Sequence, residues 1–186
     1  MTNPGAWHTF GSRRIYDNRW IQLDLVEVQA PNGERFEHHV VRLDTVAIAL
    51  VVNERDEVLM LQRHRFAIDT WGYELLGGIV EDGETPVAAA EREAVEESGW
   101  RPLGEPTHLA SFEPMPGMVT SRTDVFWWRG AQYVGEPTDT EEAGTVEWVP
   151  AKRARHLLAN NELLGAGTIV GIQAWLLAAG TAWAAI

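Results

Sequence analysis

The segment Thr45 to Val52, with the sequence TVAIALVV, constrains the fold of this chain most strongly. It is a near-continuous apolar run of the kind found in strands that are buried on both faces of a sheet. A charged turn follows it, and Val58 to Gln62 then predicts a second strand. These two segments predict the centre of the sheet.

The remaining pattern alternates strands with helices. Trp20 to Val28 and Arg35 to Arg42 flank the turn Pro31-Asn32-Gly33 and predict a hairpin. Further strands are expected at Thr107 to Phe112, Asp124 to Trp128 and Thr145 to Val149, with helices at Thr85 to Ser98, at Ala151 to Ala159 and near the C-terminus. Interleaved strands and helices predict an α/β or α+β fold.

Composition supports one soluble globular domain. The 186 residues are 45% hydrophobic and 23% charged, which is enough for one sizeable core, so we expect a single domain over residues 1–186. The formal charge of -12 repels phosphate backbones and anionic lipids, which argues against nucleic acid and membrane surfaces as partners. The absence of cysteine excludes disulfides, thiolate zinc sites and a cysteine nucleophile. Residues 1–10 carry no secretory pattern, so a cytoplasmic location is expected.

The uncharged run from Gly165 to Ile186 leaves two alternatives open. Its length suffices to cross a bilayer, but it contains Gln173 and four glycines, and no Lys/Arg cluster flanks it. We therefore favour a buried C-terminal helix over a membrane span. Such a helix needs apolar cover from the same domain or from a partner subunit.

The helix expected at Thr85 to Ser98 carries the most specific chemistry. Thr85 is a candidate N-cap, Pro86 fits the first helical position, and Gly99 fits a position just past the end. Glu93, Glu96 and Glu97 stand at i, i+3 and i+4 and therefore share one helix face. Such a triplet is either a solvated acidic face or an oxygen-rich site for a hard cation such as Mg²⁺ or Mn²⁺.

The surroundings of the triplet favour the metal site. Seven residues fall at the spacing G-x5-E-x7-R-E-U-x-E-E-x-G-U, namely Gly78, Glu84, Arg92, Glu93, Glu96, Glu97 and Gly99. This spacing resembles the Nudix box, the signature of the Nudix hydrolases. The two U positions hold Ala94 and Trp100, which depart from the usual aliphatic residues in size. The resemblance implies an α/β/α sandwich with a mixed sheet, in which residues 43–180 form the core and residues 1–42 an N-terminal hairpin region.

The resemblance also implies roles for the matching residues. It implies that Glu93 and Glu97 are the principal metal ligands, that Glu96 is a further or water-mediated ligand with a part in catalysis, and that the Gly77 carbonyl is a backbone ligand. Arg92 would orient the carboxylates, with Glu84 as its partner. Divalent cations acidify water and neutralise charge on a phosphoanhydride, so the expected reaction is hydrolysis of an X-linked nucleoside diphosphate.

A general base is still required, and in Nudix enzymes it often lies outside the box on a loop nearer the C-terminus. The stretch GEPTDTEEA at residues 135–143 offers two candidates. We favour Glu142 and keep Glu141 as the alternative.

Other segments resemble the ADP-ribose pyrophosphatase subgroup. Gln62-Arg63-His64-Arg65 and Tyr73 to Gly78 resemble its Q-x-R and E-L-x-G-G patterns, and Pro114 to Met118 resembles its Pro-Gly loop. This resemblance implies that Arg65, Glu74 and Gly117 contact or adjoin the substrate. Thr120-Ser121-Arg122 stands where related enzymes often carry a glutamate.

The expected substrate is thus a small nucleotide, with ADP-ribose, cleaved to AMP and ribose 5-phosphate, as the best guess. A nucleotide sugar, a nucleoside triphosphate and a coenzyme A derivative remain alternatives, as does a non-catalytic Nudix nucleotide sensor. Trp20 and Trp71 are candidates for stacking on a nucleobase. The tryptophan-rich composition, the uncharged tail and the resemblance predict a homodimer.

Overall fold

The computed structural model describes residues 5–139 and 144–178, which form two compact units. The first unit contains the chain up to Asp44 together with Glu113–Arg122, and the second contains the rest. The boundary after Asp44 lies close to the end of the N-terminal region that the sequence predicts.

The smaller unit is a four-stranded sheet in the order β1-β2-β3-β10. Its strands are β1 (His8–Asp17), β2 (Gln22–Gln29), β3 (Arg35–Arg42) and β10 (Val119–Thr120). β2 and β3 pair antiparallel around Gly33, which has a φ of 89°, and this confirms the predicted hairpin. β1 was not predicted, because all ten of its residues are exposed and its sequence therefore lacks an apolar alternation.

One acidic side chain is buried in this sheet. Asp24 on β2 is 4% exposed and accepts hydrogen bonds from the Nε atoms of Arg14 on β1 and Arg42 on β3. The hydrogen bonds from Arg14 and Arg42 lower the pKa of Asp24 below its ordinary value. This ion-paired cluster fastens the three strands to one another.

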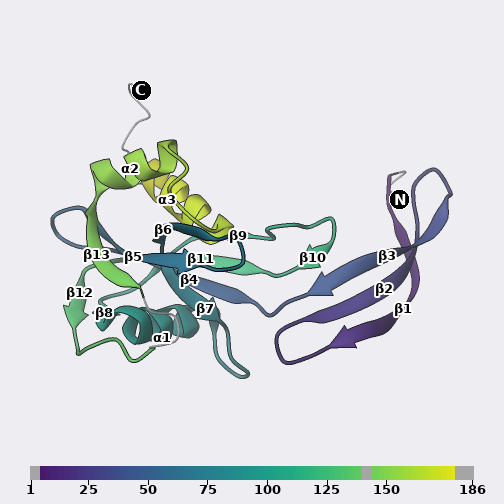
Figure 1. Cartoon of the computed structure of the whole chain (residues 1–186), viewed down its shortest axis with the longest axis horizontal. Coiled ribbons are helices and arrows are strands. Elements are labelled where there is room, and N and C mark those ends of the chain that lie inside the picture. The colour runs from purple at the N-terminus through teal and green to yellow at the C-terminus, as the bar shows by residue number, and fades with distance from the viewer. Residues whose placement is uncertain (1–4, 140–143, 179–186) are drawn as a thin grey trace. The chain divides into compact units, whose positions relative to one another are not determined.

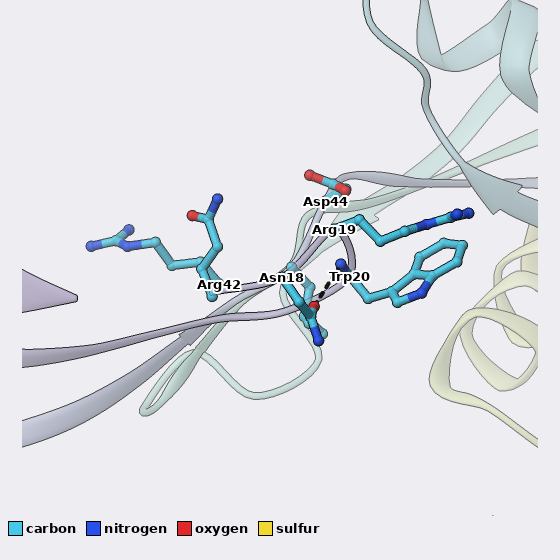
Figure 2. Close-up of a pocket in the computed structure, with 7 residues that line it drawn as sticks. Asn18, Arg19, Trp20, Arg42 and Asp44 are labelled. Atoms are coloured by element: carbon cyan, nitrogen blue, oxygen red, sulfur yellow. Dashed lines mark hydrogen bonds between the residues drawn. The ribbon is translucent and has the colours of Figure 1, made fainter. Parts of the chain in front are cut away.

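The turn between β1 and β2 borders a small polar pocket (Figure 2). Asn18 Oδ1 accepts the backbone N–H groups of Trp20 and Ile21 at 2.8 and 2.7 Å, and the Arg19 guanidinium lies 3.9 Å from the centroid of the Trp20 ring. Trp20 is thus in the turn that precedes β2, with about half of its surface exposed.

The larger unit contains a mixed seven-stranded sheet. Its main path is β13-β5-β4-β11-β9, with β6 paired to β5 and β7 paired to β4. The bounds are β4 (Val46–Val52), β5 (Glu57–Arg65), β6 (Thr70–Glu74), β7 (Leu76–Ile79), β9 (Thr107–Phe112), β11 (Thr123–Arg129) and β13 (Thr145–Pro150). β4 and β11 are parallel, and the other pairs are antiparallel. A separate pair joins β8 (Trp100–Pro102) to β12 (Ala131–Tyr133).

Helices cover both faces of this sheet (Figure 1), with α1 (Pro86–Ser98) on one face and α2 (Ala151–Ala159) and α3 (Ala166–Ala178) on the other. The strand β4 supplies both cores. Ala47, Ala49 and Val51 pack towards α1, whereas Ile48, Leu50 and Val52 pack towards α3. This confirms that the segment is buried on both faces.

The helix ends agree with the sequence expectation. The Thr85 side chain accepts the N–H of Ala88 at 3.3 Å, and Gly99 adopts a φ of 74° and donates its N–H to the Val95 carbonyl. On α3, the buried residues include Ile172, Trp175 and Leu176. Within the described part of the chain, none of the helices has the length and hydropathy of a membrane span.

Candidate active site

Two helix carboxylates lie against the backbone of β7. The N–H of Gly77 donates to Glu97 Oε2 at 2.8 Å, and the Glu97 side chain is only 2% exposed. Glu93 lies so close to Gly78 that a Cβ atom at residue 78 would be 2.3 Å from Glu93 Oε1. Any side chain at residue 78 would therefore displace the Glu93 carboxylate from this position. The structure thus brings Gly77, Glu93 and Glu97 together.

Arg92 links three carboxylates. Its Nη1 atom lies 2.8 Å from Glu93 Oε1 and 2.9 Å from Glu96 Oε2. Its Nε and Nη2 atoms each lie 3.1 Å from one oxygen of Glu84, which is the bidentate geometry of a strong ion pair. The hydrogen bond from Arg92 lowers the pKa of Glu84, and Glu84 in turn raises the pKa of Arg92. Nη2 also donates to the Ile79 carbonyl at 3.0 Å, so Arg92 ties α1 to β7.

A second arginine, Arg63 on β5, belongs to the same site and was not identified from the sequence. Its buried guanidinium donates from Nε to Glu74 Oε2 at 2.9 Å and from Nη1 to Glu97 Oε1 at 3.0 Å. Arg65 also pairs with Glu74, with Nε at 2.9 Å from Oε1 and Nη2 at 2.7 Å from Oε2. Burial opposes ionisation of Glu74, but Arg65 and Arg63 outweigh it, and the pKa of Glu74 is lowered.

The alternation of β5 could have revealed Arg63. Leu59 and Leu61 pack into the core on the α1 side, and period two places Arg63 and Arg65 on the same face. An arginine that continues an inward-facing row needs buried acidic partners. Glu74 on β6 and Glu97 on α1 are those partners.

The candidate bases Glu141 and Glu142 lie outside the described residues. Both described flanks of their segment are at the site. The N–H groups of Thr138 and Asp139 donate to the Glu96 carbonyl at 2.9 and 3.1 Å, and a Cβ atom at Gly144 would lie 3.2 Å from the Arg63 Cβ. The described residues before the segment thus lie beside α1, and Gly144 after it lies beside β5.

The remaining expected residues belong to other segments of the chain. Gly117 belongs to the smaller unit, where its carbonyl is 2.9 Å from His38 Nε2. In the same unit, the Glu113 carboxylate accepts the N–H of Ser121 at 2.7 Å. Trp71 on β6 is 68% exposed, and its ring is 5.5 Å from the ring of His64.

The oxygen donors fit a hard divalent cation. Glu93, Glu96 and Glu97 share a helix face, the backbone of Gly77 lies beside Glu97, and carboxylate and carbonyl oxygens are the ligands that such cations take. Among the described residues, no three acidic or imidazole side chains surround a common point, because Arg92 and Arg63 hold the carboxylates. In the described structure these carboxylates are thus paired with guanidinium groups.

Comparison with known proteins assigns this arrangement to a class. Residues 41–165 match the model of the NUDIX domain, and the chain belongs to this family. It is therefore a Nudix hydrolase with an α+β fold and pyrophosphohydrolase chemistry, a class whose members generally use divalent metals.

The chain is also similar to individual Nudix proteins of named activity and to a solved structure. The CMP-5'-(N-acetyl-N-hydroxy-3-aminopropyl)phosphonate hydrolase of Streptomyces rubellomurinus is 42% identical over 170 residues, which cover 91% of this chain and 82% of the relative. The ADP-ribose pyrophosphatase of Bacillus subtilis is 26% identical over 167 residues, covering 89% and 90%. A solved structure, an ADP compounds hydrolase, superposes with a TM-score of 0.82 at 16% identity and covers 98% of this chain and all of that one. The last comparison confirms the fold.

Proposed function

We propose that this protein hydrolyses the phosphoanhydride that joins a nucleoside monophosphate to a second phosphorus-bearing group. The observation that carries the proposal is the placement of Glu93 and Glu97 against Gly77–Gly78 in a chain of the Nudix family. A pure nucleotide sensor would have no chemical need for this repulsive set of carboxylates. A water molecule would attack one phosphorus, and the bond to the bridging oxygen would break.

The cation in this proposal is Mg²⁺ or Mn²⁺, held by Glu93, Glu97 and the Gly77 carbonyl, with Glu96 as a further or water-mediated ligand. When bound, it supplies a more acidic water and neutralises charge on the phosphates. Arg92 orients Glu93 and Glu96, and Arg63 holds Glu97, through the contacts described above.

Arg65 is the proposed phosphate contact. Its side chain is 41% exposed, so it can reach a ligand, while its bonds to Glu74 fix its direction. A guanidinium is suited to phosphate because it offers paired donors in a fixed plane. Gly117 and the Pro-Gly loop are kept as proposed substrate contacts on the strength of the resemblance.

Glu142 is the proposed general base, because both flanks of its segment lie at the site. Glu142→Gln should reduce kcat about 100-fold or more with little change in KM, since a base acts in the transition state. Glu141→Gln is the matched control. An equal or larger loss of kcat in the control would transfer the role to Glu141.

ADP-ribose, cleaved to AMP and ribose 5-phosphate, is the first proposed substrate, supported by the named activity of the Bacillus relative. A second candidate is a cytidine monophosphate joined to a phosphonate, favoured by the 42% identity to the Streptomyces enzyme. Both candidates present the same P–O–P bond to the metal site. They differ in the nucleobase and in the group that leaves with the second phosphorus.

Specificity constants decide between these candidates. They should be measured with Mg²⁺ for ADP-ribose, a CMP-linked phosphonate, a nucleotide sugar and a nucleoside triphosphate, with products resolved by chromatography. A preference for either of the first two identifies the substrate class. A preference for the nucleotide sugar would keep the reaction and change the substrate, and a preference for the triphosphate would refute both proposed substrates. No turnover of any of them would refute the proposed reaction.

We also propose a homodimer. β1 is an edge strand that is exposed along its whole length, and Trp7, Phe10 and Ile15 on or beside it are large exposed apolar residues. Exposed apolar edges are commonly covered by a second chain. Light scattering at micromolar concentration should give the mass of a dimer, and Phe10→Asp should weaken it; a monomeric wild type would reject the proposal.

A further inference from the structure

A polar cluster outside the Nudix box lies on the same sheet face as the metal-site carboxylates. Residues Gly78, Ala47, Asp124 and Ser111 are register partners across β7, β4, β11 and β9. Register partners point to the same face, and Gly78 and Ala47 face α1. With a strand spacing of about 4.8 Å, Asp124 is about 10 Å and Ser111 about 14 Å from Gly78.

An irregularity in β9 adds His108 to this face. Ser111 pairs with Asp124, Ala110 with Val125, and His108 with Phe126, so Leu109 is an extra residue. In a regular strand, residues three apart point to opposite faces. The bulge at Leu109 instead places His108 beside Ser111, and bulges that re-aim a side chain are frequent next to active sites.

The hydrogen bonds of the cluster run from His108 to Ser111 and from Ser111 to Asp124, with the first-named residue donating in each. The Ser111 hydroxyl donates its only proton to Asp124 Oδ1. His108 Nε2 lies 2.9 Å from Ser111 Oγ and must therefore be the donor in that bond. In the neutral tautomer that fits these contacts, Nε2 carries the proton and Nδ1 is the acceptor. Nε2 also lies 3.5 Å from Asp124 Oδ1.

The exposure of these groups separates their roles. The Asp124 side chain is 4% exposed, whereas that of His108 is 50% exposed, and the His108 ring packs 5.3 Å from the ring of Phe126. Asp124 is a positioning residue that favours the proton on Nε2, both through Ser111 and through its own 3.5 Å contact with Nε2. His108 is the group that can touch a ligand. A buried carboxylate also disfavours phosphate here, so the neutral part of a nucleotide fits better.

We propose that His108 Nδ1 accepts a hydrogen bond from the exocyclic amino group of the substrate's nucleobase, with Ser111 and Asp124 holding His108 in the accepting tautomer. Adenine and cytosine carry such a donor, whereas hypoxanthine and uracil present a carbonyl at the same position. The proposal rests on the proposed function, because it assumes that the phosphates of a nucleotide lie at Gly78 and Glu93. The site therefore selects amino-bearing bases over their oxo counterparts.

Calorimetric binding of AMP, IMP, CMP and UMP to the full-length protein with Mg²⁺ tests this subsite without turnover. The wild type should bind AMP more tightly than IMP, and CMP more tightly than UMP, by about tenfold. His108→Ala should bring both ratios close to one. Ser111→Ala and Asp124→Asn should do the same with His108 intact, and Ser111→Ala covers the case in which Asp124→Asn does not fold. Thr107→Ala, an exposed neighbour on β9, is the control and should keep the wild-type ratios.

Equal affinities in the wild type, no binding of any of the four nucleotides, or unchanged ratios in His108→Ala would overturn the subsite. Turnover of ADP-ribose is measured on the same wild-type preparation. Turnover without base preference refutes the subsite alone. Base preference without turnover of any nucleoside diphosphate derivative refutes the proposed function alone.

Discussion

Two carboxylates of this protein are each held between two arginines, and they serve different ends. Asp24 pairs with Arg14 and Arg42 in the smaller unit, and Glu74 pairs with Arg63 and Arg65 in the larger one. Both acids are nearly buried, and both have a lowered pKa. Burial and arginine pairing therefore do not distinguish a functional cluster from a structural one.

The two clusters differ in the second carboxylate that their arginines contact. Arg14 also forms an ion pair with Asp17, an exposed residue of its own strand. Arg63 continues to Glu97, and Glu97 contacts the Gly77 backbone, so Glu74 is connected to the proposed metal ligands. The Glu74 cluster is therefore distinguished as functional by its connection to a set of mutually repelling carboxylates.

The largest effect is expected from removing the arginine that makes this connection. Arg63→Met leaves Glu74 and Glu97 with fewer cationic partners in a buried setting, and the free energy of unfolding should fall by about 3–5 kcal/mol. Urea denaturation measures this free energy of unfolding.

Added Mg²⁺ should restore part of the lost stability of Arg63→Met, because a cation can replace the missing charge. Arg14→Met, with a partly exposed side chain, should cost less and show no response to Mg²⁺. Equal responses of the two variants to Mg²⁺ would remove the distinction.

The next effect concerns turnover. Glu97→Gln removes one ligand charge with little change in shape and should lower kcat by about 100-fold, or about 2.7 kcal/mol in activation free energy. Asp24→Asn is the matched carboxylate-to-amide change in the other cluster, and its turnover per folded molecule should stay near that of the wild type. Near-normal turnover of Glu97→Gln with Mg²⁺ would show that the metal assignment is wrong.

The smallest effect is on the pH dependence of stability. Because the pKa of Asp24 is lower in the folded state than its ordinary value of 3.8, its ion pairs stabilise the fold at neutral pH. This contribution is lost as the pH falls below about 4 towards the folded-state pKa. Denaturation of wild type and Asp24→Asn should thus show a stability difference at pH 7 that narrows in acid. A difference that stays constant with pH would mean that Asp24 acts through packing alone.

The sequence predicted the elements whose signals are local. The helix α1 has a capping threonine, a first-turn proline and a terminal glycine, and each of these acts within a few residues. β4 was predictable because a short uninterrupted apolar run, rich in β-branched residues, is typical of a strand that is buried on both faces. The Nudix box located the carboxylates because a helix fixes the positions of residues three and four apart.

The features that escaped prediction depend on pairing between distant segments. β1 carries no apolar alternation because it is exposed on both faces. The partners of Arg63 come from β6 and α1, and only the folded sheet brings them together. His108 and Ser111 are three residues apart in a strand, and only the bulge puts them on one face.

The bulge in β9 allows base selection to change in evolution without a change in the catalytic carboxylates. If β9 were regular with Leu109 retained, Leu109 would pair with Phe126 and His108 would turn to the opposite face, while Ser111 and its register partners on β11, β4 and β7 would stay in place. A change in the pairing of one strand could thus alter base selection while the catalytic machinery is inherited intact. A gap at Leu109 in a homologue would instead leave His108 two residues from Ser111 and on the same face, so the base contact would be kept.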